Sequence, residues 1–422
     1  MLSREPRLRQ IETTKTHPEM TAICNLLIST LLLALPVNLC AADGSVGKPR
    51  EVDGEQLQAI WDVNETLLDS DDLPLLRSAR FSVIKPYEFA KDGYRFLHGV
   101  ALCFHKGKLY ASFGHNKGGE NTDTEEARWC VSEDDGRTWS ETRTMDDGEG
   151  PIGVSHGAFL SHQGDLWAFQ GAYRGIMQGV HTRAYRLDEA TNQWRSLGIV
   201  IEGDFWPMQE PVMTGNGNWI MAGLKVGEGN PAAVAISHGG DLLKWDIVVI
   251  PSIPGTQMWG ESTVIVNGMQ VTSLSRFGGE ACVLTAVSED GGRSWSQMRR
   301  GNLPMATSKP IAGILSTGQR YLVCTTTADS GKRRSPLTIA VARPGESSFS
   351  KVFVIRHAEF PEGPGESHPD ASLSYPCAIE HEGNLYVGYS NSGDKTTRVG
   401  EGRELWNNNS AELAVIPVTA LK

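Results

Sequence analysis

The sequence predicts an all-β fold, a six-bladed β-propeller of four-stranded antiparallel blades. Three observations predict it: a sequence motif that recurs about every fifty residues, a turn glycine at a fixed position in that motif, and a high content of Gly and Trp. Of the 422 residues, 46 are glycine, 11 are tryptophan and 40% are hydrophobic. This composition suits many short strands joined by tight turns.

Each repeat opens with a short apolar run followed by a turn glycine. The six glycines are Gly107, Gly164, Gly217, Gly268, Gly318 and Gly383, and their spacings are 57, 53, 51, 50 and 65 residues. Units of this length, each of three or four strands, indicate one blade per repeat around a central axis. We expect the segment RFSVI at 80–84 to supply the strand that completes the last blade.

The most complete repeat spans residues 260–296. Its apolar runs are separated by Asn-Gly and Gly-Gly turns, which is the pattern of an antiparallel meander. It closes with Ser-Glu-Asp-Gly-Gly-Arg-Ser-Trp at 288–295, and Ser-Glu-Asp-Asp-Gly-Arg-Thr-Trp occurs at 132–139. In such a phrase the Asp accepts backbone N–H bonds, the Gly adopts a positive φ and the Trp packs beneath the turn. We therefore expect Asp134 and Asp290 to hold turns rather than to catalyse.

The N-terminal part predicts export. Residues 1–42 are expected to be a signal peptide, with an apolar segment at 22–35 and small residues at its end, and translation could begin at Met20. Residues 43–77, polar and then mildly helical in pattern, are expected to pack on the outside of a propeller that spans 78–422. The mature chain would have no transmembrane span, and we expect a secreted or periplasmic monomer.

Charge and cysteine content exclude several classes of partner. A net charge of −11 argues against nucleic acid or an anionic membrane as the main partner, although a site can be locally basic. No CxxC or other metal-ligand spacing occurs, so we expect neither a metal nor a cofactor. The mature chain's cysteines are scattered in apolar contexts, as buried thiols with at most one or two disulfides would be. They are Cys103, Cys130, Cys282, Cys324 and Cys377.

A titratable side chain lies just before the apolar run of each repeat. In a propeller this run forms the innermost strand, so the residue before it is expected to face the mouth of the central channel. Strand ends are often polar because they are exposed, but six such residues in apolar surroundings favour a site. The six are His98, His156, Glu210, Glu261, Lys309 and Tyr375.

From about residue 78 to its end, the chain resembles the sialidase superfamily of β-propellers, whose Asp box is the Ser-x-Asp-x-Gly-x-(Ser/Thr)-Trp phrase described above. The resemblance implies that Tyr375 is the nucleophile and that Glu261 takes its proton. A phenol, with a pKa of about 10, needs such a base. A neutral nucleophile also avoids repulsion by the carboxylate on the anomeric carbon of sialic acid, and sialidases are an exception to the usual carboxylate pair.

The resemblance further implies three arginines that hold the carboxylate of the substrate through bidentate contacts. Arg276 and Arg334 match two of them, with Arg333 as an alternative to Arg334. The third departs from the family pattern. Distance from the turn glycine places His98 there, whereas residue type places Arg95 there. If His98 is the equivalent, the carboxylate clamp is incomplete.

The resemblance places the acid that protonates the leaving oxygen in the loop after the second strand of the first repeat. Glu120 lies at the expected distance before the first box serine, with Asp123 and Glu125 close by. The chosen group would need a raised pKa, through burial or a neighbouring carboxylate. A loop with several acids could also be a solvated surface loop.

The favoured function is therefore an exported, retaining exo-glycoside hydrolase that cleaves a terminal acidic sugar, sialic acid or similar, from glycans. One alternative is a polysaccharide lyase that acts on uronic acids, using His98, His156 and Tyr375. Another is a catalytically silent propeller that binds glycans or a partner protein, because fold does not fix function.

Overall fold

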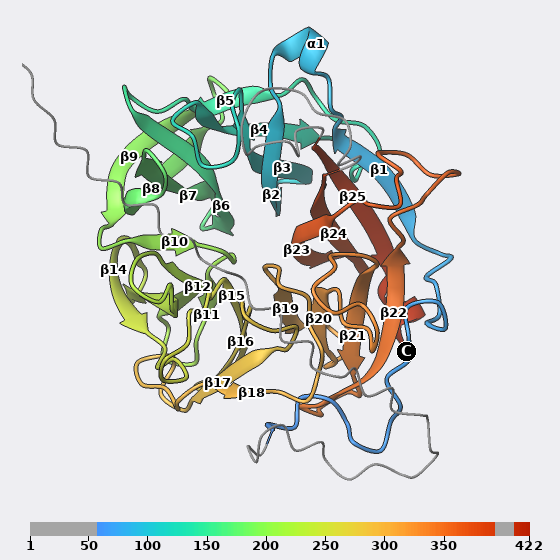
Figure 1. Cartoon of the computed structure of the whole chain (residues 1–422). Coiled ribbons are helices and arrows are strands. Elements are labelled where there is room, and N and C mark those ends of the chain that lie inside the picture. The colour runs from blue at the N-terminus through green and yellow to red at the C-terminus, as the bar shows by residue number, and fades with distance from the viewer. Residues whose placement is uncertain (1–56, 393–408) are drawn as a thin grey trace, which may run out of the picture. The chain divides into compact units, whose positions relative to one another are not determined.

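The computed structural model describes residues 57–392 and 409–422. Within them the strands form six antiparallel sheets arranged as the blades of a β-propeller, as Figure 1 shows, and the predicted fold class is confirmed. The helices of this part are α1, Phe89–Asp92, and the 3-10 helix η1, Val418–Leu421. Neither has the length and apolar character that a membrane span needs. The predicted signal peptide, residues 1–42, lies outside the described residues.

The strands follow one another blade by blade along the chain. The first blade contains β2 (Phe96–His105), β3 (Lys108–Asn116), β4 (Glu125–Ser132) and β5 (Arg143–Asp146). The second contains β6 (Ile152–His162), β7 (Asp165–Arg174), β8 (Gln178–Asp188) and β9 (Gln193–Ile201). The third contains β10 (Phe205–Pro207), β11 (Val212–Met213), β12 (Trp219–Lys225), β13 (Ala232–His238) and β14 (Asp241–Val249).

The remaining three blades complete the ring. The fourth contains β15 (Ser262–Asn267), β16 (Gln270–Ser275), β17 (Leu284–Ser288) and β18 (Arg299–Arg300). The fifth contains β19 (Ile311–Ile314), β20 (Arg320–Cys324), β21 (Leu337–Ala342) and β22 (Phe349–Arg356). The sixth contains β23 (Leu373–His381), β24 (Asn384–Asn391), β25 (Ser410–Pro417) and β1 (Arg80–Lys85).

The sixth blade joins the two ends of the propeller. β1 pairs antiparallel with β25, from Arg80 opposite Val415 to Lys85 opposite Ala411. In Figure 1 the blue β1 accordingly lies beside the red β25. The prediction that residues 80–84 complete the last blade is therefore confirmed, and this pairing keeps the first and last repeats in contact.

The predicted turns have the expected backbone geometry. All six turn glycines have a positive φ, between 62° at Gly268 and 82° at Gly164 and Gly217. In the Asp boxes, the backbone N–H of Thr138 donates to Asp134 at 2.8 Å, and that of Ser294 donates to Asp290 at 2.9 Å. Hydrogen bonds from these two residues lower the pKa of both carboxyl groups to about 2. The two aspartates hold turns, as predicted.

Apolar side chains pack between neighbouring blades and fix the inner strands around the axis. Between the sixth and first blades, Leu102 and Leu109 pack in one buried cluster with Leu413. Between the third and fourth blades, Val234 packs in a second cluster with Val264. Within the described residues the cysteines form no disulfide with one another.

The described part of the lead-in, residues 57–77, contains no helix, so its helical pattern was misleading. Trp61 instead bridges to Phe349 on β22. The side-chain carbonyl of Asn302 accepts the backbone N–H groups of Ile60 and Trp61, at 2.8 and 2.7 Å. Because the blades supply partners for this backbone, an extended course satisfies it better than a helix does.

The inner edge of the third blade also differs from the prediction. Glu210 was expected to stand just before the inner strand, but it lies in a break between β10 and β11, which both pair with β12. Pro207 and Pro211 flank this break, and proline cannot donate a ladder hydrogen bond. The inner edge of this blade therefore begins with β10, before Glu210, and not just after Glu210 as predicted.

Candidate active site

Three inner strands are irregular at the places where predicted site residues lie. The pairing register shifts just after His98 in β2, at Ser155 and His156 in β6, and at Tyr375 in β23. Such bulges turn side chains out of the regular alternation of a strand and are frequent beside active sites. The backbone of Tyr375 also has a φ of 53°, a left-handed conformation that is costly for a residue with a Cβ.

The bulges border a pocket with a volume of about 240 Å³. Seven of the eleven predicted site residues line it: His98, Glu120, His156, Glu261, Arg276, Arg334 and Tyr375. The remainder of its wall contains Phe96, Asn121, Glu125, Ser155, Met177, Trp206, Met208, Leu224 and Trp259. The structure therefore brings together, from five blades and one loop, four of the six residues predicted from their place in the repeat and three predicted from the family resemblance.

Tyr375 and Glu261 are in direct contact. The phenol donates to Oε1 of Glu261 at 2.5 Å, and Nη1 of Arg276 donates to the same oxygen at 2.6 Å. Both Tyr375 and Glu261 are buried. Burial, together with the neighbouring Glu261 charge, raises the pKa of the phenol above its ordinary value. The phenol is therefore protonated at neutral pH, and Glu261 is placed to take its proton during a reaction.

Two guanidinium groups flank Tyr375. The guanidinium carbon of Arg334 lies 5.7 Å from the centre of the Tyr375 ring, and Nη1 of Arg276 lies 3.3 Å from the phenol oxygen. Two hydrogen bonds fix the Arg334 guanidinium: its Nε and Nη2 donate to the carbonyl of Thr307 at 3.3 and 3.0 Å. Arg334 Nη1 and Arg276 Nη2 make no hydrogen bond to another described residue and can bind a ligand carboxylate.

His98, one of the two residues expected at the third arginine position, lies in the pocket. The His98 ring lies 3.7 Å from the Tyr375 ring, centre to centre, inside the pocket. Burial, with the nearby cationic groups, lowers the pKa of His98 well below its ordinary value, so this side chain is neutral. Arg95 does not line the pocket, and its guanidinium instead lies 4.8 Å from the centre of the Phe89 ring.

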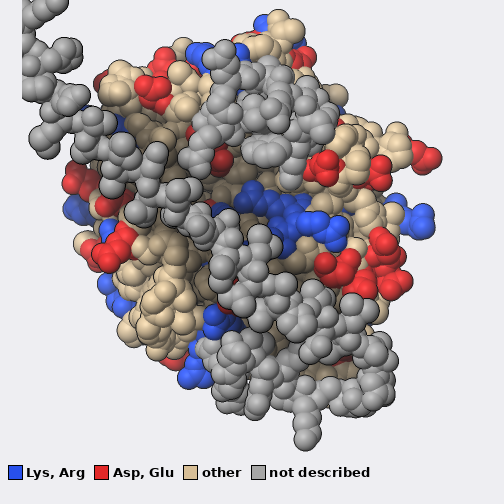
Figure 2. Space-filling model, viewed as in Figure 1, with Lys and Arg blue, Asp and Glu red and all other residues tan. Residues whose placement is uncertain are grey.

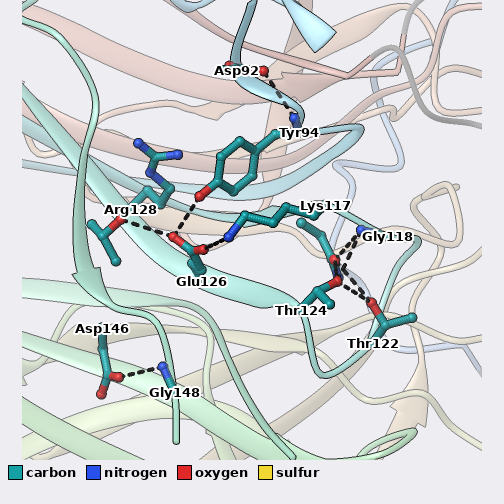
Figure 3. Close-up of polar contacts among 12 residues, drawn as sticks. Asp92, Tyr94, Lys117, Gly118, Thr122, Thr124, Glu126, Arg128, Asp146 and Gly148 are labelled. Atoms are coloured by element: carbon teal, nitrogen blue, oxygen red, sulfur yellow. Dashed lines mark hydrogen bonds and ion pairs between the residues drawn. The ribbon is translucent and has the colours of Figure 1, made fainter. Parts of the chain in front are cut away.

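The loop between β3 and β4, residues 117–124, is held by one asparagine. Oδ1 of Asn116 accepts hydrogen bonds from the N–H of Gly118 at 2.8 Å and from the hydroxyl groups of Thr122 and Thr124 at 3.0 and 2.5 Å. Figure 3 shows Gly118, Thr122 and Thr124 converging on this point. The loop is therefore a folded turn whose side chains have defined directions.

This turn places Glu120 in the pocket wall and leaves Asp123 outside it. Lys117, the first residue of this loop, pairs with Glu126 at 2.5 Å, and the phenol of Tyr94 donates to the same carboxylate, as Figure 3 shows. Glu120 remains exposed at the rim of the pocket. The protein around it nevertheless displaces water and raises the pKa of its carboxyl group, with Arg334 opposing the shift.

Glu125, expected only as an acidic neighbour of Glu120, forms a buried network. Its carboxylate accepts hydrogen bonds from the hydroxyl groups of Ser155 and Tyr173, the second at 2.5 Å. Burial raises the pKa of Glu125 to about 7. Strand alternation was the signal that could have found it, because adjacent Glu125 and Glu126 must point to opposite faces of β4.

Two of the residues expected just before an inner strand, Glu210 and Lys309, lie outside the pocket. Lys309 is buried, and its ammonium donates to the carbonyl of Pro376 at 2.6 Å, beside Tyr375 in the chain. Burial lowers the pKa of Lys309 and raises that of Glu210. Trp206 of β10, which sequence reasoning missed, lines the pocket where Glu210 was expected, and its indole N–H donates to the carbonyl of His156 at 3.0 Å.

A second cavity of about 390 Å³ adjoins the first and shares His98, Glu120 and Arg334 with it. Lys332 and Arg333 also line this cavity. Figure 2 shows a group of Lys and Arg side chains near the middle of the face in view. The site region is thus locally basic in a chain of net charge −11, which suits an anionic ligand. Among the described residues, no three His, Cys, Asp or Glu side chains are grouped to hold a metal ion.

The family model described as BNR repeat-like domain matches residues 153–387, more than half of the chain. No curated protein matches the sequence.

Several solved structures have the same fold. A protein of unknown function from Dyadobacter fermentans is 14% identical, with a TM-score of 0.59, over 80% of this chain and 99% of that one. The NanB sialidase from Streptococcus pneumoniae is 10% identical, with a TM-score of 0.60, over 81% and 71%. A leech intramolecular trans-sialidase is 10% identical, with a TM-score of 0.62, over 81% and 71%. The chain therefore belongs to the sialidase-like superfamily of β-propellers with BNR repeats.

Proposed function

We propose that this protein is an exported exo-glycoside hydrolase that removes a terminal acidic sugar, sialic acid or a similar one, from glycans with retention of configuration. The observation that carries the proposal is the 2.5 Å hydrogen bond from the Tyr375 phenol to Glu261, inside a pocket that also holds two guanidinium groups. The apolar segment at 22–35 supports export.

The reaction has two steps. In the first, the phenol oxygen of Tyr375 attacks the anomeric carbon and its proton passes to Glu261, while Glu120 gives its proton to the leaving glycosidic oxygen. In the second, Glu120, now a carboxylate, takes a proton from water, which displaces the phenol oxygen from the anomeric carbon. Glu261 then returns its proton to Tyr375.

The two arginines give the pocket its preference for an acid. The planar guanidinium fork of Arg276 and of Arg334 matches the geometry of a carboxylate. The raised pKa of Glu120 supports its role, because a general acid must be protonated before the first step.

The experiment that tests the proposal is incubation of the purified protein with glycosides of sialic acid, uronic acids and neutral sugars. We expect hydrolysis of at least one acidic glycoside, and proton NMR should show that the first-formed sugar keeps the anomeric configuration of the substrate. Release of the opposite anomer would exclude the covalent mechanism. Binding without turnover across the panel would favour a glycan-binding propeller.

The two neutral imidazoles beside Tyr375 favour one second candidate, a lyase that acts on uronic acids. His98 and His156 lie 3.7 and 5.7 Å from the Tyr375 ring, centre to centre, where a base could remove a proton from C5 of a uronate. Burial lowers the pKa of His156 to about 3, however, which makes it a weak base. An ultraviolet-absorbing unsaturated uronate product would identify this activity.

A further inference from the structure

His156 stands at the end of a hydrogen-bond chain that begins at the buried carboxylate of Glu125. Ser155 contacts both groups: its hydroxyl donates to Oε1 of Glu125, and its oxygen lies 3.0 Å from Nδ1 of His156. Above the pKa of Glu125, about 7, its carboxylate is ionised and can only accept hydrogen bonds, so Ser155 gives its single proton to Glu125. The Ser155 oxygen must then accept from His156, which fixes the imidazole proton on Nδ1.

Nε2 of His156 consequently carries a lone pair. This atom is buried and has no hydrogen-bond partner among the described residues. His156 itself is 5% exposed and lines the pocket together with Tyr375. A buried acceptor without a partner carries a free-energy penalty, which a donor on a bound ligand would remove.

The side chains of Glu125, Ser155 and His156 pack against two glycines, where a larger residue would not fit. A Cβ on Gly114 would lie 2.3 Å from Oε1 of Glu125 and 2.7 Å from the Ser155 oxygen. A Cβ on Gly99, whose φ is +66°, would lie 2.1 Å from the His156 ring. The arrangement therefore depends on the absence of side chains at two separate places in the first blade.

We propose that Nε2 of His156 accepts a hydrogen bond from a hydroxyl group of the bound sugar acid, and that this contact helps to select the substrate. The inference rests on the proposed function and adds a specificity determinant to it. A carboxylate oxygen is repelled by the Nε2 lone pair, so the acid group binds Arg276 and Arg334 and a neutral O–H group faces His156. A sugar acid with no hydroxyl at that place leaves the acceptor unpaired.

The tautomer is tested by NMR of the full-length protein labelled with 15N in its histidines. At about pH 8, above the pKa of Glu125, we expect the His156 resonances, assigned by their loss in His156→Phe, to show a protonated Nδ1 and an unprotonated Nε2. Ser155→Ala, which removes the acceptor of Nδ1–H, should give a mixture of tautomers. A proton on Nε2 in the wild-type protein at this pH would overturn the inference whatever the protein binds.

The contact is tested by calorimetric titration with free sialic acid and free glucuronic acid at the same pH, about 8, where Glu125 is ionised. His156→Phe should weaken binding of the accepted acid roughly ten- to a hundredfold, while His181→Phe, on β8 of the same blade and outside the pocket, should not. An accepted acid should also shift the Nε2 resonance. Binding that is undiminished in His156→Phe would overturn the inference and leave the proposed hydrolase intact. If neither acid binds the wild-type protein, the acidic-sugar proposal and this inference both fail.

Discussion

Tyr375 and Glu261 lie 114 residues apart in the chain, yet the phenol of one donates a 2.5 Å hydrogen bond to the carboxylate of the other. The sixth blade supplies Tyr375 and the fourth supplies Glu261, just before β15. Arg276, after β16, donates to the same carboxylate oxygen. Their contact exists only because the ring of blades closes.

Replacement of Tyr375 by Phe should abolish turnover. The variant keeps the ring but has no oxygen to attack the anomeric carbon, so we expect kcat to fall by at least about a thousandfold. Steady-state assays on the accepted glycoside measure this, with circular dichroism to confirm folding. Tyr386→Phe, on β24 of the same blade and outside the pocket, should keep full activity. Hydrolysis at the wild-type rate by Tyr375→Phe would refute the assignment.

Replacement of Arg334 by Lys should weaken binding of acidic substrates. Lysine keeps the charge but loses the planar fork, so we expect KM for an acidic glycoside to rise about ten- to a hundredfold. Arg95→Lys serves as the matched control, because Arg95 lies over Phe89 and outside the pocket. An increase of KM in Arg95→Lys with none in Arg334→Lys would show that Arg95, not Arg334, holds the carboxylate.

Replacement of Glu120 by Gln should impair substrates with poor leaving groups most. Without the acid, we expect kcat/KM for an alkyl glycoside to fall about a hundredfold or more, and much less for a nitrophenyl glycoside that leaves unaided. The acidic limb of the second step should also vanish from the pH profile. Asp123→Asn should change little, since Asp123 lies outside the pocket. Equal losses on both substrates would exclude an acid role for Glu120.

Replacement of Lys309 by Met should slow catalysis without weakening binding. The Lys309 ammonium donates to the carbonyl of Pro376 and so holds the backbone that carries Tyr375 in its positive-φ conformation. We expect kcat to fall about tenfold and KM to stay nearly constant, as for a residue that positions the nucleophile. Lys351→Met, on the exposed face of β22, is the control. A change in KM alone would contradict a positioning role.

Glu125 should make stability depend on pH. Burial raises its pKa from 4.5 to about 7, so between these values the folded protein binds more protons than the unfolded chain. Its contribution to stability is therefore greatest at low pH and falls as pH rises from 4.5 to about 7, by about 3 kcal/mol in total.

Urea unfolding of the wild type and of Glu125→Gln across this pH range isolates the contribution. The free energy of unfolding of the wild type minus that of the variant should decrease as pH rises, because only the wild type carries the titrating carboxyl group. A difference that does not vary with pH would mean that Glu125 titrates normally.

Much of the fold could be predicted from the sequence because its signals are local. Glycines such as Gly164 and Gly268 mark hairpin turns wherever they stand, since the required positive φ belongs to the turn itself. The Asp134 and Asp290 boxes are likewise complete within eight residues, 132–139 and 288–295. Counting repeats then gave six blades, and the repeat phase brought Tyr375 and Glu261 forward as candidates.

The tertiary structure decided which side chains reach the pocket. Bulges in β2, β6 and β23 direct His98, His156 and Tyr375 into it, and a strand break beside two prolines puts Trp206 where Glu210 was expected. The direction of a side chain at a bulge or break depends on how the neighbouring strand is paired. That pairing belongs to the assembled blades, so the repeat could name the positions but could not determine which residues face the site.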